Sequence, residues 1–445
     1  MSKRLDPWRG KHLSSGGKLV LTNSCLTSLP IYTMGFHLLP RGSHGEMDSV
    51  RSNFFWKGAN DDFKYHMARW ETLCRPKDQG GMGIINTETM NQCLLVKWIW
   101  KIMKGSNDTW FKLLEAKYMP NGNFFTSKSK GGSQFWQGLH KVKHLFKWGA
   151  IHKVKDGFKT FFWEDIWVER VPLKVCFPNL FNICRDPKAL VVDYYDEGNW
   201  HIDFKRTLNT SDLEELNTLL DMLNTVQLDF SESDEVEWAL DSSKSFSTKS
   251  LYRFLTHRGV MISQGNNIWK SKLPLKIKIF LWQLSHNKLQ TAVALSKRGW
   301  KGSIKCSLCG KIESVNHIFF TCSLARFAWC VIKNIFGLTS CPKSWGDLQG
   351  GWLPRNLNIP HRLGWFLYAG FAWALWCNRN KMAIEKKFPN LPMNVIYVGL
   401  SFVQKWKSLL KPIDQQKLEP VLELAKKWLS KYMPSKDMMS DIREL

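Results

Sequence analysis

The chain has 445 residues, of which 44% are hydrophobic and 23% carry charge, so its composition excludes global disorder. At roughly 150 residues per domain, this length predicts about three domains. The formal net charge of +25 favours a polyanionic partner, nucleic acid ahead of an anionic membrane, because each neutralised phosphate releases condensed counterions. A basic protein without such a partner is the alternative.

The charge is unevenly distributed along the chain. Between Asp193 and Asp241 there are 14 acidic residues and two basic ones, a local net charge of −12, so the remainder carries +37. A solvated helix and spacer is predicted within this acidic stretch. Ser211 is its expected N-cap, and Glu214 would complete a capping box.

Neither export nor membrane insertion is predicted. No apolar stretch follows residues 1–7, so a secretory signal is not expected. The uncharged run at 363–377 is shorter than the about 20 residues of a membrane span and predicts a buried helix. The eleven cysteines are mostly scattered, which favours reduced thiols in an intracellular compartment.

The first segment, residues 1–118, is predicted to be mostly helical. One helix is expected over 45–56, where apolar residues recur at helical spacing. A glycine-rich loop at 80–83 precedes a second helix, which Asn86 or Thr87 would cap. The loop lacks the spacing of either nucleotide-binding fingerprint, so no phosphate site is expected there.

The second segment, residues 119–245, is predicted to mix helices with small β-hairpins. An amphipathic helix is expected over 134–146. An Asp-Gly pair at 156–157 lies between residues 151–155 and 158–163, which is a short-range signal for a hairpin. A second small hairpin is expected over 236–246.

The third and fourth segments are residues 246–335 and 336–445. Ser247 or Thr248 would cap a helix that leads into a polar linker at 256–267. Beyond the linker, a helix is expected over 275–287, and the last segment is predicted to be helical throughout.

Cysteine and histidine residues in the third segment have the spacing of a metal site, C-x2-C-x7-H-x4-C. The two-residue spacing of Cys306 and Cys309 lets both sulfurs reach one ion, and Gly310 permits a sharp turn after them. On an α-helix, His317 and Cys322 would lie about 140° apart, so this pair needs a helix terminus or a loosened turn. Three cysteines and one histidine are a set that tetrahedral structural zinc uses.

Four protein ligands leave no open position for water or substrate, which predicts one structural Zn²⁺ ion rather than a catalytic one. Folding of the module should then depend on the metal. Chance clustering of core residues is the alternative, and Cys330 could compete as the fourth ligand, although its apolar surroundings are typical of a core. The other cysteines have no partner pattern and are expected in the core: Cys25, Cys74, Cys93, Cys176, Cys184, Cys341 and Cys377.

These observations together predict a mainly α fold with small β-hairpins, an α+β chain in several parts with one structural zinc-binding module. Around the metal ligands, the sequence resembles the reverse-transcriptase zinc-binding domain of plant non-LTR retrotransposons. The similar segments, in chain order, are 246–252, 268–270, 273–282, 289–291, 298–299, the four metal ligands and 325–329. Upstream segments resemble the part of those elements that follows the polymerase palm: 13–18, 29–32, 70–71, 74–76, 80–84 and 97–98. Residues 162–167 resemble the middle region of the same elements.

The resemblance implies the C-terminal, post-palm part of a reverse transcriptase, with residues 1–118 as a thumb-like region. Polymerases of this kind hold catalytic Mg²⁺ with an aromatic-x-Asp-Asp hairpin. The adjacent aspartates here, Asp61 and Asp62, follow a polar Gly-Ala-Asn sequence without an aromatic residue and are expected to form a turn. Polymerase activity is therefore not expected, and the chain is predicted not to be an enzyme.

The predicted function is a noncatalytic, zinc-binding and nucleic-acid-binding fragment of such a reverse transcriptase. RNA, DNA or both are the expected partners, a polymerase chain is a further candidate, and the resemblance implies the nucleus. Three alternatives stay open: a protein-interaction scaffold, a decayed element remnant, and a Mg²⁺-dependent nuclease using Glu385, Lys387 and Asp347. The candidate nucleic-acid contacts are Lys276, Lys278, Lys297, Arg298, Trp300 and Lys305.

Overall fold

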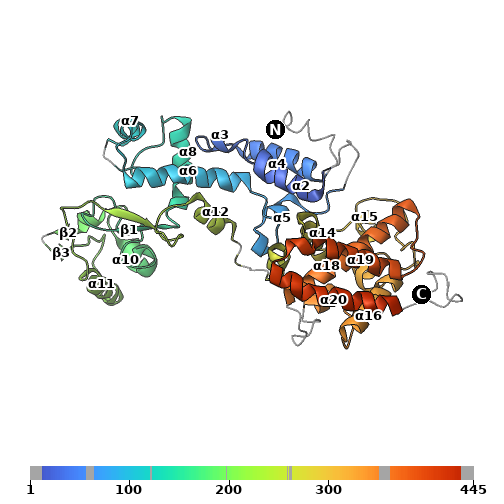
Figure 1. Cartoon of the computed structure of the whole chain (residues 1–445). Coiled ribbons are helices and arrows are strands. Elements are labelled where there is room, and N and C mark those ends of the chain that lie inside the picture. Colours follow the sequence, from blue (N-terminus) through green and yellow to red (C-terminus); the bar gives the residue numbers. More distant parts are fainter. Residues whose placement is uncertain are drawn as a thin grey trace. The chain divides into compact units, whose positions relative to one another are not determined.

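The computed structural model describes residues 13–56, 65–120, 123–196, 198–257, 259, 263–349 and 361–431. The chain forms two compact units that alternate along the sequence (Figure 1). Unit 1 comprises Met1–Leu26, Met47–Ile84 and Arg258–Leu445, and unit 2 comprises Thr27–Glu46 and Ile85–His257. Helix α4 (Arg41–Trp56) contributes residues to both.

Helices are the main secondary structure of unit 1 in its described part. Its first two segments contain short elements, and the segment after residue 258 contains the longer helices. The elements are α2 (Ser15–Leu21), η1 (Thr22–Leu26), α5 (Trp70–Cys74), η2 (Lys77–Gln79), α13 (Ser263–Lys270), α14 (Leu275–Ser285), α15 (Ala292–Ser296), η4 (His317–Thr321), α16 (Ser323–Phe336), α17 (Trp345–Gln349), α18 (His361–Asn380), η5 (Lys381–Glu385), α19 (Met393–Trp406), η6 (Lys407–Leu409) and α20 (Pro412–Lys431).

Helix α14 joins the early and late segments of unit 1 because it is buried on two sides. Ile277 and Phe280 belong to the large core that α16, α18, α19 and α20 share. Ile279 and Trp282 belong to a smaller core with residues from α2, α4 and α5. The Trp282 indole also donates a 2.8 Å hydrogen bond to the carbonyl of Gly80, which ties α14 to the loop after η2.

Two glycines set the close packing of α18 against α19. A Cβ atom added at Gly370 would lie 2.4 Å from a methyl group of Val403, and one at Gly399 would lie 2.5 Å from the ring of Phe371. Both separations are below van der Waals contact, so only glycine fits at either position. Residues 363–377, within α18, are mostly buried, as predicted. Among the described helices, none has the length and apolar character needed to cross a membrane.

Unit 2 contains two aromatic cores. The first is formed mainly by α6 (Thr87–Lys104), α8 (Gln134–Phe146), α12 (Thr248–Thr256) and one small sheet, and it buries Trp136, Phe146 and Trp238 completely. The second buries Phe162 and Trp163 against short elements. The remaining elements are α3 (Ile31–Met34), α7 (Thr109–Tyr118), α9 (Leu173–Cys176), α10 (Pro178–Ile183), η3 (Val191–Tyr194) and α11 (Thr210–Leu223).

The mainly helical fold with small antiparallel sheets confirms the predicted fold class, but the predicted hairpins are wrong in position. Strand β1 (Ala150–Lys153) pairs with β4 (Glu235–Trp238) and not with residues 158–163. After β4 the chain turns, and Trp238 N–H donates to the carbonyl of Lys244 without forming a second strand. The remaining sheet is a two-residue pairing of β2 (Tyr195–Asp196) with β3 (Asn199–Trp200).

Helix starts were predicted well where a capping side chain directly precedes an amphipathic run. Asn86 caps α6, Ser133 caps α8 and Ser247 caps α12. The acidic helix α11 is an exception, because its N-cap is Asn209 and its capping box uses Asp212 rather than Ser211 and Glu214. The predicted linker at 256–267 is also too long, since α13 begins at Ser263. Asp61 and Asp62 lie outside the described residues.

Candidate metal centre

The Cys306–Cys309 pair lies on a tight backbone knuckle. Cys306 N–H donates to the carbonyl of Lys311 at 2.7 Å, and Gly310 N–H donates back to the carbonyl of Cys306 at 3.0 Å. Gly310 has φ +69°, a left-handed conformation that costs glycine little. A β-bridge between Lys305 and Ile312 closes the base of the turn, so both sulfurs face the same side.

The other two candidate ligands lie at the ends of a π-helical turn. Residues His317–Thr321 form η4, and Cys322 N–H donates to the carbonyl of His317 at 2.7 Å, five residues back. This wider turn is the loosened geometry that the five-residue spacing requires, and such turns are frequent at functional sites. Cys322 is extended and occupies the N-cap of α16, so its sulfur lies at the positive end of a helix dipole.

The structure brings the four candidate ligand side chains together. One ligand atom from each of Cys306, Cys309, His317 and Cys322 lies within 4.8 Å of the others. Cys309 Sγ is 3.3 Å from His317 Nε2. Ligand atoms of a tetrahedral zinc site are about 3.5–3.8 Å apart, so the widest separation has to close by about 1 Å around an ion. The donor set therefore fits one tetrahedral metal ion.

Electrostatics within the cluster favour a thiolate. A hydrogen bond from the Cys322 thiol lowers the pKa of Cys306 to about 3 despite burial, and backbone N–H groups of Leu308 and Cys309 contribute in the same direction. The same contact raises the pKa of Cys322. The first proton is therefore lost from Cys306, and a bound cation would draw off the remaining thiol protons because metal ligands must be deprotonated.

The ring of His317 is oriented from both sides. Its Nε2 faces the sulfurs, and its Nδ1 lies 3.4 Å from the hydroxyl of Thr321, one residue before Cys322. A second hydrogen bond of this kind typically fixes the ring of a metal-binding histidine. Cys306, His317 and Cys322 are buried, and the cysteines belong to the large core of unit 1.

A buried ion pair supports the loop between the two ligand pairs. The Glu313 side chain is 2% exposed, and its carboxylate accepts from Arg379 Nε at 3.1 Å and from Ala292 N–H at 2.9 Å. Glu313 thus joins the metal loop to α15 and α18. Glu313 was not predicted as a site residue, and its only signal in the sequence is that it is a lone acidic residue inside the C-x7-H interval.

The six candidate nucleic-acid contacts differ in how they are held. Lys278 donates to the carbonyl of Trp269 at 2.9 Å, and burial lowers its pKa. Arg298 donates to the carbonyls of His66 and Met67, so its guanidinium braces unit 1. The other four side chains are exposed: Lys276, Lys297, Trp300 and Lys305.

The net charge of the chain belongs to unit 1. Its sequence ranges contain 40 lysines and arginines and 15 aspartates and glutamates, whereas those of unit 2 contain 23 of each. Unit 1 therefore carries +25 and unit 2 is formally neutral, since the acidic stretch within unit 2 offsets its lysines. The same unit thus holds the candidate metal ligands and the whole of the excess positive charge.

Several other cysteines are not fully buried, contrary to the prediction, although Cys341 packs against the large core of unit 1. Cys330 and Cys176 are exposed, and Cys25, Cys341 and Cys377 are half-buried. The Cys330 Sγ atom is 3.9 Å from that of Cys341 and takes no part in the metal cluster. The three that are buried as predicted are Cys74, Cys93 and Cys184.

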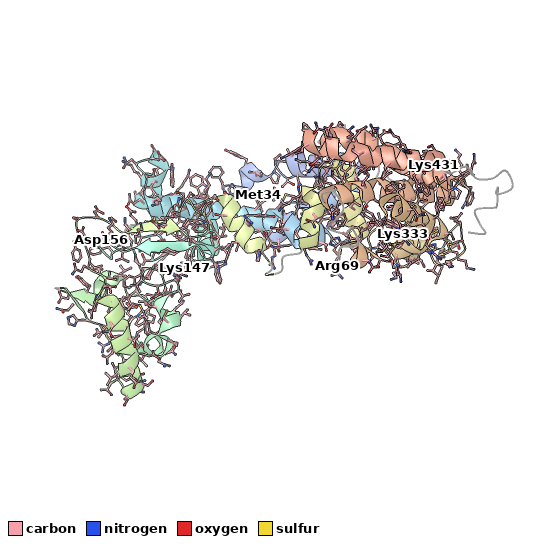
Figure 2. All side chains as sticks on the ribbon, turned by 60° about the horizontal axis from the view of Figure 1, so that its bottom comes forward. Met34, Arg69, Lys147, Asp156, Lys333 and Lys431 are labelled. Carbon is pink, nitrogen blue, oxygen red and sulfur yellow. The ribbon has the colours of Figure 1, made fainter. Side chains whose placement is uncertain are left out.

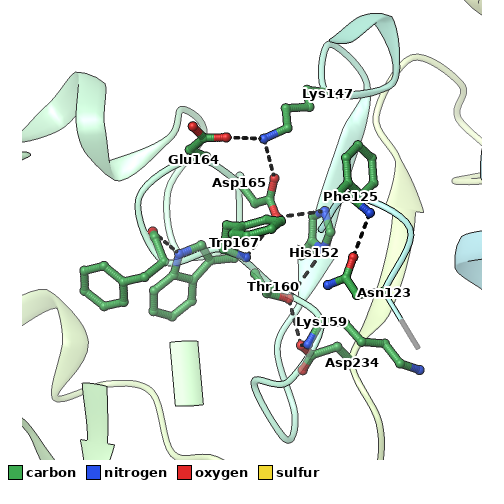
Figure 3. A network of polar contacts seen from close by, with 12 residues as sticks. Asn123, Phe125, Lys147, His152, Lys159, Thr160, Glu164, Asp165, Trp167 and Asp234 are labelled. Carbon is green, nitrogen blue, oxygen red and sulfur yellow. Dashed lines mark hydrogen bonds and ion pairs between the residues drawn. The ribbon is translucent and has the colours of Figure 1, made fainter. Parts of the chain in front are cut away.

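A polar network in unit 2 brings a hydroxyl next to an imidazole and that imidazole next to a carboxylate (Figure 3). Thr160 Oγ1 lies 3.3 Å from His152 Nδ1, and His152 Nε2 lies 3.7 Å from Asp165. The hydroxyl donates to Asp234 at 2.8 Å and is fully buried, so no substrate reaches it. The network instead anchors the chain between Lys147 and Asp156, two residues that flank β1 (Figure 2).

The glycine-rich loop at 80–83 binds no phosphate in this conformation. The backbone N–H groups of residues 81–83 donate to the carbonyls of residues 73, 75 and 76, at distances of 2.9–3.1 Å. Its amides are therefore used within unit 1, in agreement with the absence of a nucleotide fingerprint.

Comparison with known proteins identifies the domain that contains the cluster. Residues 246–329 match the family described as zinc-binding in reverse transcriptase. The matched range contains all four candidate ligands, and its first residues, through His257, belong to unit 2. Residues 246–329 are thus similar to the reverse-transcriptase zinc-binding domain, as the resemblance implied.

Two plant proteins are similar to larger parts of the chain. A putative ribonuclease H protein of Arabidopsis thaliana is 27% identical over 343 residues, which cover 74% of this chain and 54% of that protein. An uncharacterized mitochondrial protein of the same plant is 27% identical over 149 residues, 33% of this chain and 97% of its own length. The chain therefore spans about half the length of the first relative. The mitochondrial description of the second gives no support to the predicted nuclear location.

Proposed function

We propose that the chain is a noncatalytic part of a retroelement reverse transcriptase, in which a structural Zn²⁺ ion stabilises a basic unit that binds nucleic acid. The observation that carries this proposal is the coincidence, within unit 1, of a closed Cys3His cluster with the entire net charge of +25. A positive net charge of this size attracts phosphate backbones, because binding releases their condensed counterions.

Zinc is the metal that the donor set favours. Three thiolates and one imidazole suit a borderline-soft ion with tetrahedral preference, whereas Mg²⁺ and Ca²⁺ require oxygen ligands. Cys306, Cys309, His317 and Cys322 would hold the ion, and all four coordination positions would then come from the protein. A closed site of this kind organises the fold and activates no water, which supports a structural rather than a catalytic role.

The first experiment measures zinc per chain and nucleic-acid binding on the same preparation. Wild type should contain about one zinc, and the Cys306→Ser/Cys309→Ser variant should lose it. Binding to labelled duplex DNA and RNA should weaken steeply between about 50 and 200 mM salt, because each neutralised phosphate contributes a slope of about −0.9 in log K against log salt for B-DNA.

Three outcomes would contradict the proposal. Folded wild type without zinc would remove the metal centre. Absent or salt-insensitive binding would favour a protein-interaction scaffold or a decayed remnant. Divalent-metal-dependent cleavage of plasmid DNA that is lost in Glu385→Ala would instead establish the nuclease alternative. In the structure, the Glu385 carboxylate lies 3.4 Å from Lys387 Nζ, in an exposed ion pair.

A nuclear location and association with a separate polymerase chain are further parts of the proposal. Both follow from the resemblance to retrotransposon reverse transcriptases. Localisation of a tagged full chain in plant cells, with a mitochondrial marker beside a nuclear one, tests the first. Co-purification with a polymerase chain from the same cells tests the second.

A further inference from the structure

Unit 1 contains a cavity of about 290 Å³ whose walls come from α2, the end of α4, α14 and α18. Ligand pockets are typically about 300–1,000 Å³, so this cavity lies just below that range and suits one planar ring system. Three lysines line it, Lys18, Lys276 and Lys288, and among the residues that the structure describes no carboxylate belongs to the lining. The cavity is therefore cationic as well as concave.

Aromatic side chains form another part of the wall. Trp56 at the end of α4, Phe280 on α14, and Trp373 and Trp376 on α18 line the cavity. The ring centroids of Phe280 and Trp373 are 5.0 Å apart at 78°, an edge-to-face arrangement that holds the Trp373 indole in place. Lys276 Nζ lies 4.9 Å from the centroid of Trp373, so the ammonium group covers one face of the indole.

We propose that this cavity binds one unpaired nucleotide of single-stranded nucleic acid, with the base stacked on Trp373 and the adjoining phosphates held by Lys18, Lys276 and Lys288. The assignment rests on the proposed nucleic-acid binding and specifies its substrate class. Every base has a π-face, so stacking on tryptophan accepts any sequence but requires an unpaired base. The side-chain amide of Gln283, also in the lining, is a hydrogen-bonding group within the same cavity.

Lys276 is exposed, which lets a base displace its ammonium group from Trp373. An exposed cation–π contact is weaker than stacking of a base on an aromatic side chain. The displaced ammonium group then neutralises a phosphate beside the bound base, so the contact that is lost is replaced by a charge-assisted one. Lys276 was a candidate contact from sequence, whereas the tryptophans of α18 were not.

The candidate metal centre is linked to this cavity through two contacts. Phe319, two residues after His317, is fully buried, and its ring centroid lies 5.9 Å from Phe280 and 6.4 Å from Trp376. Arg379, the partner of Glu313 in the metal loop, lies 5.1 Å over the ring of Trp376. The cavity wall and the metal loop therefore share one packed region, and Lys276, Phe280 and Lys288 of the wall lie within the matched range 246–329.

The test uses the zinc-loaded full chain and fluorescein-labelled 12-residue oligothymidylate, its oligouridylate counterpart and a duplex of equal length. Trp373→Ala should weaken single-strand binding about tenfold and leave duplex binding unchanged, because stacking is lost and the general charge is kept. Trp373→Phe keeps an aromatic face and should restore most of the affinity. Trp148→Ala removes an exposed indole from unit 2 and should have no effect.

A second variant tests the same cavity independently, in case Trp373→Ala does not fold. Lys276→Gln/Lys288→Gln should reduce the slope of log K against log salt for the single strand by about 1.4, because each phosphate contact contributes about 0.7 on a single strand. The single change Lys427→Gln on α20 is the charge control and should change this slope by at most about 0.7. Thymidine monophosphate should compete only weakly. Competition as strong as that of the oligonucleotide would show a free-nucleotide site and overturn the single-strand assignment.

The failure of this inference and that of the proposed function are distinguishable. If Trp373→Ala and the double lysine variant bind the single strand like wild type, the cavity is not the site, although salt-dependent binding survives. If wild type binds neither strand form, the proposed function itself fails. Zinc content and circular dichroism of each variant must match wild type for either conclusion.

Discussion

Units 1 and 2 differ in what stabilises them. Unit 2 is formally neutral and is built around two aromatic cores and a buried carboxylate network. Unit 1 carries +25, and its largest core includes sulfurs of the Cys3His cluster. Self-repulsion of a high net charge destabilises a compact state. Metal binding is a direct way to offset that repulsion while keeping the positive surface, so charge and metal site are expected in the same unit.

The largest expected difference between the units is their response to metal removal. Chelation, or Cys306→Ser/Cys309→Ser, should unfold the metal loop and loosen α15, η4 and α16, because structural zinc contributes on the order of 10–16 kcal/mol in small modules. Hydrogen exchange read by mass spectrometry measures this, with faster exchange in unit 1 peptides. Peptides from α6 and α8 are the internal control. Equally faster hydrogen exchange in peptides of both units would contradict a stabilising role of the metal that is specific to unit 1.

The buried ion pair should give the next largest effect. Arg379→Ala leaves the Glu313 carboxylate buried without its cation, and removing one partner of such a pair costs about 3–5 kcal/mol. The matched double variant, Arg379→Ala with Glu313→Gln, should be less destabilised than Arg379→Ala alone. Urea unfolding monitored on unit 1 peptides by hydrogen exchange gives both values. A single variant as stable as wild type would show that the pair is dispensable.

Within unit 2, Asp234 makes the most hydrogen bonds of the carboxylate network. Its oxygens accept from the N–H groups of Lys155, Gly157 and Lys159 and from the hydroxyl of Thr160. Asp234→Ala should cost unit 2 about 1–3 kcal/mol, because it leaves buried donors unpaired. Thermal unfolding of unit 2 measures this, with Asp221→Ala, an exposed carboxyl on α11, as the control.

The same carboxylate makes unit 2 sensitive to acid. Burial alone would raise the pKa of Asp234, but the hydrogen bonds from its donors together lower it. A lowered folded-state pKa adds stability above the ordinary aspartate value of about 3.9, and this is lost as the pH falls through the folded value. Asp234→Asn should therefore flatten the decline in unit 2 stability below about pH 4. If the decline is unchanged in Asp234→Asn, other carboxyl groups cause the loss of unit 2 stability at low pH.

The smallest of these effects concerns a helix cap in unit 2. Asn86 Oδ1 accepts from Thr89 N–H at 3.0 Å at the start of α6. Asn86→Ala should cost about 1 kcal/mol, and Asn86→Ser should recover most of it, since serine caps nearly as well. Chemical denaturation of unit 2 resolves the difference. Nucleic-acid affinity should not change in either variant, which separates stability of unit 2 from binding by unit 1.

The sequence contains the local parts of the metal centre but not its long-range support. Spacing alone indicates the four ligands and the need for a loosened turn, because both are set by neighbours a few residues apart. The partner of Glu313 is Arg379, 66 residues later, and no local pattern links them. Zinc ligation by the four residues stays a prediction that metal analysis has to test.

The hairpins show the same limit. The Asp-Gly pair at 156–157 is a genuine turn signal, but a turn does not choose the partner of the strand before it. Strand β1 pairs with β4 because Val236 and Trp238 bring large apolar side chains to the unit 2 core. The cavity lined by Trp373 and Lys276 likewise combines residues from α14 and α18.

The division of the chain into four domains, at 1–118, 119–245, 246–335 and 336–445, remains a prediction.

The interleaving of the two units has a consequence during synthesis. Leu19, Phe55 and Leu73 share their core with Ile279 and Trp282, about 200 residues further along the chain. At about 5–20 residues per second, a ribosome needs roughly 10–40 s to make the intervening sequence. Unit 2 is complete at His257 and is available to fold first, while the early segments of unit 1 wait as exposed apolar chain. Chaperone demand should therefore peak before α14 emerges.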